Sequence, residues 1–124
     1  MKRMILTGLA ALALVFSLSA CSPAQVRAYM NAVAYWNKYN GEASPAKLAS
    51  IRNCESDGNY TAVSRNGRYR GAYQFSQSTW NSVASRHYPH LVGKDPARVA
   101  PYQQDAMALA LISERGFSAW PHCG

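Results

Sequence analysis

Apolar side chains at helical spacing mark the first segment beyond the extreme N-terminus. Residues 24–39 contain no Pro or Gly, and Val26, Met30 and Val33 follow one another at steps of four and three residues. This spacing places the three side chains on one face and predicts an amphipathic helix. We expect the helix to dock on the rest of the protein. Alternatively, its aromatic residues would let it lie as a stalk at a membrane surface.

A second helix is predicted over residues 45–56, because Ser44 can cap its first turn and a proline follows at the first helical position. With about 3.6 residues per turn, Glu55 falls between Leu48 and Ile51 on the apolar stripe of this helix. A carboxylate at such a position loses hydration, which raises its pKa. Glu55 is therefore either paired or functional, and it is the first candidate catalytic residue.

The chain after this helix is polar and rich in turn residues. An Asp-Gly-Asn sequence ends the helix, and two short segments, residues 60–63 and 69–75, flank an Asn-Gly pair. An Asn-Gly pair between such segments is typical of a hairpin. We predict a short hairpin or a pair of irregular strands in this region.

Two more helices follow. Ser76 or Ser78 can cap a helix that ends before Pro89. Residues 103–115 carry a broad apolar face, and Gly116 ends that helix. The predicted fold is a single small domain of the α+β class, mostly α, with one short hairpin.

A short cationic start and an apolar run over residues 5–18 precede these elements. The run is too short to span a bilayer and is typical of a signal peptide. It ends in Leu-Ser-Ala-Cys, which resembles the bacterial lipobox. We therefore expect residues 1–20 to be removed and Cys21 to be lipidated, whereas ordinary cleavage would leave Cys21 free. The remaining chain divides into a lipid-anchored segment, residues 21–43, and a domain, residues 44–124, on the outer side of the bacterial cell membrane, facing the cell wall.

The cysteine count fits this interpretation. Three cysteines are present, and exported proteins tend to pair theirs. A lipidated Cys21 leaves Cys54 and Cys123 as the only possible partners of a disulfide. Such a bridge would close a loop of about 70 residues and contribute about 4 kcal/mol in the chain-entropy model, a large share of a small domain's stability.

Composition excludes several classes of protein. With 48% hydrophobic and 15% charged residues, the chain is neither disordered nor collagen-like. It has no glycine-rich phosphate-binding motif, so nucleotide chemistry and a cofactor are not expected. His87 and His90 form a His-x-x-His pair that a proline interrupts, with no acidic cluster nearby, and no metal site is predicted. We expect a monomer.

The chain is basic, with a formal net charge of +7 at pH 7. Arg65, Arg68 and Arg70 lie near the predicted hairpin, where on a strand they would share a face. Nucleic acid is not expected as a partner of an exported protein. Anionic wall polymers or phospholipid headgroups are the natural partners of such a face, and a merely solvated face is the alternative.

Three ordered motifs resemble the transglycosylase-like domain of the resuscitation-promoting factors. They are Cys-Glu-Ser-Asp-Gly-Asn-Tyr at residues 54–60, Tyr-Arg-Gly-Ala-Tyr-Gln-Phe-Ser-Gln-Ser-Thr-Trp at 69–80 and Trp-Pro-His-Cys at 120–123. The resemblance implies a small lysozyme-like domain that acts on peptidoglycan glycan strands. In that family the helix glutamate after the first cysteine, here Glu55, is the catalytic acid, and the two cysteines are bridged.

The same resemblance implies a sugar groove lined by Tyr69, Gln74, Thr79 and Trp80. An aromatic ring such as Tyr69 can stack on a pyranose, and Gln74 can bond an N-acetyl group. Trp80 is equally suited to the core. The sequence departs from the family pattern in the groove wall, for example at Asp57, where the family usually has Gly.

Cleavage of the β-1,4 bond between N-acetylmuramic acid and N-acetylglucosamine needs an acid that protonates the leaving oxygen. Among candidate second carboxylates, Asp57, Asp95, Asp105 and Glu114, none has a convincing position, although Asp57 could face the cleft. The resemblance therefore favours lytic transglycosylation, in which the sugar's own 6-hydroxyl attacks and Glu55 serves as acid and then base. Muramidase hydrolysis at the same site and a non-catalytic peptidoglycan-binding lipoprotein are the alternatives.

Overall fold

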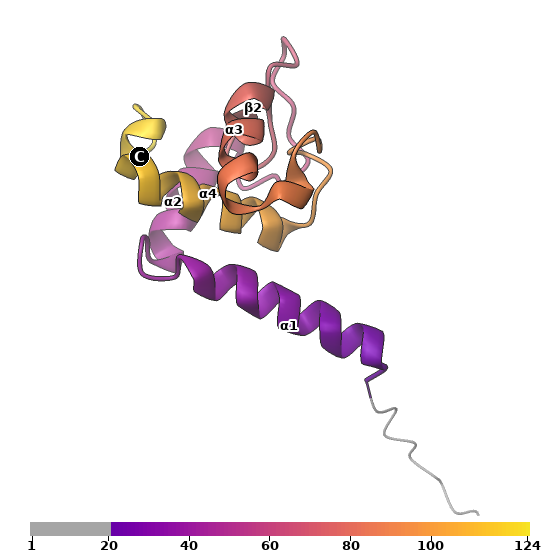
Figure 1. The fold of residues 1–124 in the computed structure, drawn as a ribbon. Coiled ribbons are helices and arrows are strands. Elements are labelled where there is room, and N and C mark those ends of the chain that lie inside the picture. The colour runs from indigo at the N-terminus through magenta and orange to yellow at the C-terminus, as the bar shows by residue number, and fades with distance from the viewer. Residues whose placement is uncertain (1–20) are drawn as a thin grey trace, which may run out of the picture.

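The computed structural model describes residues 21–124, so the predicted signal peptide, residues 1–20, lies outside the described residues. The described chain is mostly helical and contains a two-stranded antiparallel sheet (Figure 1). This confirms the predicted α+β class, mostly α. The elements in chain order are α1 (Pro23–Lys38), α2 (Pro45–Ser56), β1 (Tyr69–Arg70), β2 (Phe75–Ser76), α3 (Gln77–His87), the 3₁₀ turn η1 (Pro89–Leu91), α4 (Pro101–Arg115) and the 3₁₀ turn η2 (Gly116–Ala119).

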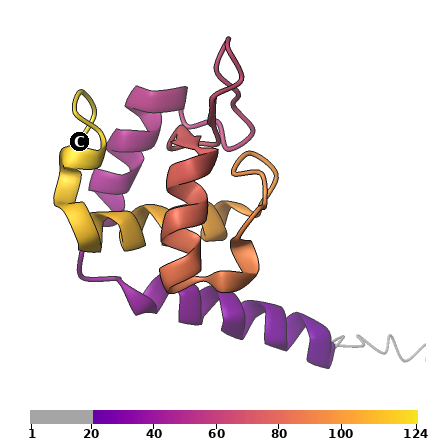
Figure 2. The ribbon, with the colours of Figure 1, turned by 45° about the horizontal axis from the view of Figure 1, so that its top comes forward.

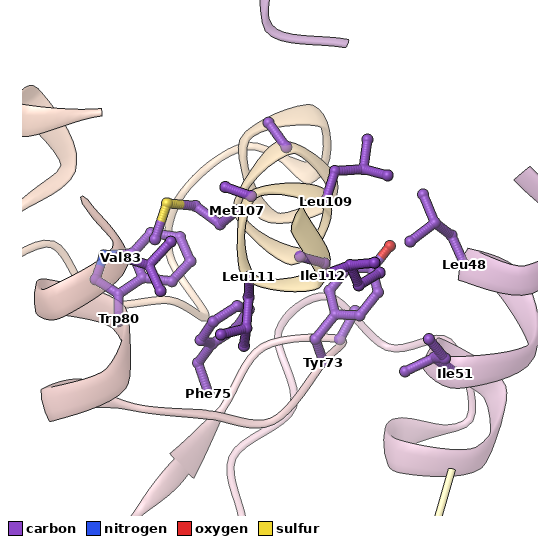
Figure 3. Packing of buried hydrophobic residues seen from close by; sticks show 14 of the residues in the cluster. Leu48, Ile51, Tyr73, Phe75, Trp80, Val83, Met107, Leu109, Leu111 and Ile112 are labelled. Atoms are coloured by element: carbon purple, nitrogen blue, oxygen red, sulfur yellow. The ribbon is translucent and has the colours of Figure 1, made fainter. Parts of the chain in front are cut away.

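Helix α4 forms the centre of the core. Every residue from 106 to 112 on this helix is buried. Figure 3 shows Trp80 and Val83 of α3 on one side of α4 and Leu48 and Ile51 of α2 on the other. These contacts join helices from distant parts of the sequence into one core. Fully burying one such side chain contributes about 1.5–3 kcal/mol to the stability of the fold.

Serine caps set where three of the helices begin. Ser22, Ser44 and Ser76 each accept a hydrogen bond from the backbone N–H three residues later. Ser76 is thus the cap of α3, which settles the choice between the two serines considered from the sequence. Helix α1 starts at Pro23, one residue earlier than predicted, because Ser22 forms a capping box with the residue three positions on. Helix α4 starts at Pro101, two residues earlier than predicted.

The segments that pair in the sheet differ from those of the predicted hairpin. Its two regular strands are β1 and β2, on either side of a tight turn. The segment over residues 60–63 contributes an isolated bridge between Val63 and Arg70. An irregular pairing across the Asn-Gly turn is therefore present, but the regular strands lie at the two ends of the second predicted segment, residues 69–75, and β2 runs one residue beyond it.

Residues at positive φ make the tight turn between β1 and β2. Gly71 has φ 81° and Gln74 has φ 53°. A Cβ atom at Gly71 would lie 2.5 Å from the side-chain oxygen of Gln104, so a glycine is required there. That oxygen accepts a hydrogen bond from the backbone N–H of Ala72 at 2.9 Å, which ties the turn to α4.

Helix α1 lies across one end of the domain and packs on α4 (Figures 1 and 2). Helix α3 ends beside it, where Lys38 Nζ donates to the backbone carbonyl of His87 at 2.9 Å and the Tyr39 hydroxyl is bonded to His87 Nδ1. Helix α2 begins just after α1 and runs to the opposite end of the domain, where α3 begins (Figure 2). The C-terminal part of α1 is therefore docked on the domain, as we expected from the sequence, and is not a free stalk.

Candidate active site

A cleft of about 350 Å³ is lined by residues from the end of α2 and the start of α3. These two helix ends lie at the end of the domain opposite α1 (Figure 2). Segments far apart in the sequence form its walls: the end of α2, the turn between the strands, the first residues of α3, one position of α4 and the C-terminal tail. The lining residues are Glu55, Tyr69, Tyr73, Gln74, Phe75, Ser76, Thr79, Leu111, Ala119, Trp120 and Pro121.

Glu55 occupies the position before the last residue of α2 and is half-buried. Burial raises the pKa of its carboxyl group, and the charge of His122 lowers it to a smaller extent. The predicted disulfide is present: Cys54 is bonded to Cys123. It holds the C-terminal tail against the end of α2, so the neighbours of the two cysteines, Glu55 and His122, lie close enough to interact. A carboxyl with a raised pKa retains its proton nearer to neutral pH, as a general acid must.

Glu55 is the single acidic side chain among the residues that line the cleft. Asp57 is exposed and ends α2 in the left-handed conformation, with φ 55°. Asp95, Asp105 and Glu114 each form an ion pair with an arginine outside the cleft. Within residues 21–124, then, no second carboxylate faces Glu55 across the cleft.

Three of the four residues predicted as sugar contacts line the cleft. Tyr69 is 44% exposed. Gln74 is half-buried, and its side-chain N–H donates to the Gly71 carbonyl at 2.9 Å, which fixes the plane of the amide. The Thr79 hydroxyl accepts from the Ser76 hydroxyl at 3.0 Å. The cleft thus combines one exposed aromatic residue with two polar groups that hydrogen bonds hold in place.

The fourth predicted contact, Trp80, lies in the core. It is fully buried, and its indole N–H donates to the Leu91 carbonyl at 2.9 Å. Its ring packs edge-on against Phe75, which itself lines the cleft. Trp80 therefore packs behind the cleft wall and does not line the cleft, in agreement with the alternative that it belongs to the core. Trp120 is also buried, and its N–H donates to the Tyr73 carbonyl.

A polar network behind the cleft was not found from the sequence. Asp105 Oδ1 accepts hydrogen bonds from the hydroxyls of Tyr73 at 2.6 Å and Tyr60 at 2.8 Å and from the guanidinium of Arg52 at 3.2 Å. Burial and this carboxylate raise the pKa of both tyrosines. The network joins α2 to α4 directly beneath the cleft wall. Arg52 lies one helical turn before Glu55, so the sequence alone could have placed both side chains on the same side of the second predicted helix.

The arginines near the sheet do not share a strand face. Of the three, Arg70 lies in a strand, and its guanidinium makes two hydrogen bonds of 2.7 Å to Asp95. Arg65 and Arg68 are exposed in the preceding turn. Arg68 lines a second hollow of about 510 Å³ that meets the cleft at Ser76. The expected common face is wrong, because the strand is too short to align the three side chains.

Within residues 21–124, no three His, Cys, Asp or Glu side chains are grouped so that they could hold a metal ion. None of the helices in this part of the chain has the length and apolar character needed to cross a membrane. His87, one of the two histidines weighed as a metal ligand, instead bonds Tyr39 and Glu114. Cys21 is exposed and forms no disulfide within the described residues.

A comparison with protein families gives a match to the transglycosylase-like domain over residues 42–123. The match begins just after α1 and includes the cleft and both bridged cysteines. A search of the solved structures found no match to this chain.

Several curated proteins are similar to the same part of the chain. Resuscitation-promoting factor RpfC of Mycobacterium tuberculosis is 39% identical over 75 residues, 60% of this chain and 48% of that protein. Probable transglycosylase SceD of Staphylococcus haemolyticus is 41% identical over 73 residues, 59% of this chain and 30% of that protein. Resuscitation-promoting factor RpfD of M. tuberculosis is 40% identical over 74 residues, 60% of this chain and 43% of that protein. The chain thus covers less than half of each of these relatives.

Proposed function

Because this chain belongs to the transglycosylase-like domain family, we propose that it cleaves the glycan strands of peptidoglycan, with Glu55 as general acid and then general base. The observation that carries the proposal is the position of Glu55. It is half-buried, its pKa is raised by burial, and it is the single acidic side chain lining the cleft. The names of the similar proteins, which include transglycosylase, support the same class of reaction.

The proposed reaction breaks the bond between C1 of N-acetylmuramic acid and the bridging O4 of N-acetylglucosamine. The protonated Glu55 carboxyl gives its proton to O4 as this bond breaks and positive charge develops at C1. The 6-hydroxyl of the muramic acid then attacks C1, and its proton passes to the Glu55 carboxylate. The product is a 1,6-anhydro sugar, and Glu55 is protonated again for the next turnover. This sequence needs one carboxyl group, which agrees with a cleft that has one.

The other cleft residues would hold the sugar rather than react with it. The exposed Tyr69 ring can stack on a pyranose face. Gln74 and Thr79 are oriented by their own hydrogen bonds and can fix the polar groups of the sugar. Phe75 and Trp120, both buried, form an apolar floor on which the sugar would rest.

We place the enzyme on the outer side of the bacterial cell membrane, as a monomer held by a lipidated Cys21 and facing the cell wall. An exposed Cys21 at the start of the described chain, directly before α1, is accessible for such an anchor. Anionic wall polymers are the other partners to expect near the exposed Arg65 and Arg68.

The test is mass spectrometry of the soluble fragments that the purified protein and its Glu55→Gln variant release from purified peptidoglycan. The parent protein should release anhydro products, lighter by one water than hydrolytic ones. The variant should release at most about one hundredth as much, because removing a general acid typically costs a factor of 10² or more. Pull-down with insoluble peptidoglycan should show that the variant still binds.

Asp57→Asn is the matched control, since it neutralises an exposed carboxyl two residues away, and it should keep its activity. Ordinary reducing ends would indicate a muramidase and return attention to Asp57. Binding without any release by the folded, disulfide-bonded parent protein would contradict an enzyme and favour a non-catalytic peptidoglycan-binding protein.

A further inference from the structure

The N-terminal half of α1 carries an apolar surface that no other part of the described chain covers. Val26, Tyr29 and Met30 are 47%, 69% and 57% exposed. Positions separated by three and four residues lie on one side of a helix, so the three side chains form a continuous patch. Monomeric domains expose single apolar residues commonly, but contiguous patches of large ones mark interaction surfaces. We call these three residues the α1 patch.

The α1 patch continues a stripe whose other end is already buried. Val33, one turn after Met30 on the same face, is half-buried, and α1 packs on α4. The domain therefore covers the C-terminal part of the stripe, while the N-terminal part extends past the body of the domain, as Figure 1 shows. The matched family region begins at residue 42, so the stripe lies outside it and serves some purpose other than forming the cleft.

The charges along α1 indicate which kind of partner is complementary to the α1 patch. The helix contains Arg27 and Lys38 and no Asp or Glu. Arg27 is exposed at the edge of the patch, from where its long side chain can reach a phosphate while the neighbouring apolar groups enter the acyl region. Tyr29 is a residue type enriched at the membrane–water interface. A second copy of α1 would offer Arg27 no acidic partner, whereas an anionic lipid surface offers many.

The sequence before α1 points to the same partner. Helix α1 begins two residues after Cys21, and the apolar run over residues 5–18 ends shortly before it. We propose that the N-terminal half of α1 docks through the α1 patch on an anionic phospholipid bilayer. This docking requires neither lipidation of Cys21 nor catalysis by Glu55, so it stands apart from the proposed function.

The docked helix would also orient the cleft. The link from α1 to the domain is fixed by the bonds of Lys38 and Tyr39 to His87, at the end of α3. The cleft lies at the other ends of α2 and α3, and the twelve residues of α2 span about 18 Å at 1.5 Å per residue. A bilayer at the N-terminal half of α1 therefore leaves the cleft open on the far side of the domain.

Tryptophan probes on the full chain test the proposal. The chain is reconstituted in vesicles of phosphatidylethanolamine and phosphatidylglycerol whose acyl chains are brominated, and brominated chains quench tryptophan emission at the acyl boundary. Tyr29→Trp adds a probe in the α1 patch. We expect brominated lipid to remove about half or more of the added emission, because the apolar face of an interfacial helix lies about 5–10 Å into the headgroup region. Emission of the parent chain is subtracted as background.

Tyr69→Trp is the matched control, because it places the same probe at an exposed position in the cleft. Iodide in the water should quench it and brominated lipid should not. Quenching of the Tyr29→Trp probe by iodide instead of lipid would overturn the proposal, since the patch would then face water. Protection of that probe from both quenchers would also overturn it and indicate a second copy or another protein on the patch. Circular dichroism confirms that each variant is folded.

Discussion

Glu55 shows how much of a residue's chemistry comes from its neighbours. The residue lies on the apolar stripe of α2, so burial favours its protonated form. The charge of His122 acts in the opposite direction, and this histidine lies close enough to Glu55 to act on it because the adjacent Cys123 is bonded to Cys54. The proton affinity of Glu55 is thus set both by its own helix and by a tail 67 positions away in the sequence.

Replacing His122 with Gln should shift the pH dependence of activity. The charge of His122 lowers the pKa of Glu55, so its removal raises that pKa further. A general acid with a higher pKa stays protonated to higher pH, and the alkaline limb of the kcat/KM profile should move to higher pH. The profile is measured by release of soluble fragments from peptidoglycan, with His90→Gln, a histidine on η1 outside the cleft lining, as control. An unchanged alkaline limb in the His122 variant would contradict this role.

Gln74 holds a strained backbone conformation in the cleft wall, with φ 53°. Two substitutions separate strain from side-chain function. Gln74→Ala keeps the strain and Gln74→Gly relieves it, so the glycine variant should be more stable by about 1 kcal/mol in urea unfolding. Both variants lack the amide and should bind peptidoglycan more weakly. Equal stability of the two variants would show that the left-handed conformation carries no cost here.

At the level of elements, the disulfide joins the end of α2 to the C-terminal tail. It bridges Cys54 and Cys123, which are 69 positions apart. The tail beyond η2 brings Trp120 and Pro121 to the cleft, so the bridge fixes one wall of the site relative to Glu55. A second link, from Arg52 to Asp105, holds α2 against α4 beneath the same wall.

Removing the bridge by the double change Cys54→Ser and Cys123→Ser should lower the free energy of unfolding by about 4 kcal/mol, because a loop of about 70 residues is released in the unfolded chain. Activity should fall even below the temperature at which the variant unfolds, since the tail that lines the cleft is no longer tied. Urea unfolding and fragment release measure the two effects. Cys21→Ser, which changes an exposed cysteine that is not part of the bridge, should leave the unfolding free energy unchanged.

For the whole molecule, one polar cluster fixes how α1 sits on the domain. Glu114 of α4 binds Arg86 and His87 of α3, and His87 in turn bonds Tyr39 at the end of α1. These contacts join three helices at the end of the domain opposite the cleft. They lower the pKa of Glu114 from its ordinary 4.5 to about 2.

Glu114→Gln should therefore change how stability depends on pH. A carboxyl with a lowered pKa in the folded state stabilises the protein above its ordinary pKa, and this contribution is lost as pH falls from about 4.5 to about 2. At pH 7 the variant should lose about 1 kcal/mol, a modest value because Arg86 is half exposed and its pair with Glu114 is screened by water. Urea unfolding at a series of pH values checks this. The two proteins should converge near pH 2, and a constant difference at all pH values would contradict the assignment.

The sequence by itself determined the approximate helix boundaries and apolar faces, because these depend on residues that are close together in the chain. Ser44 and the proline after it predict the start of α2, and its apolar period places Glu55 on the stripe; both predictions agree with the structure. Likewise, the apolar period of residues 103–115 predicts the helix at the centre of the core. Caps and helical periods act within one or two turns, and such short-range effects can be read from the order of residues alone.

Only the tertiary structure decided which side chains meet. The sequence could not tell that Trp80 is buried while Tyr69 lines the cleft, since both are aromatic residues near a predicted groove. It could not place the regular strand pair, because the turn at Gly71 packs against the side chain of Gln104, 33 positions later. Nor could it show that only half of the apolar stripe of α1 is covered. Each of these depends on contacts between distant segments, and such contacts form only when the helices pack around α4.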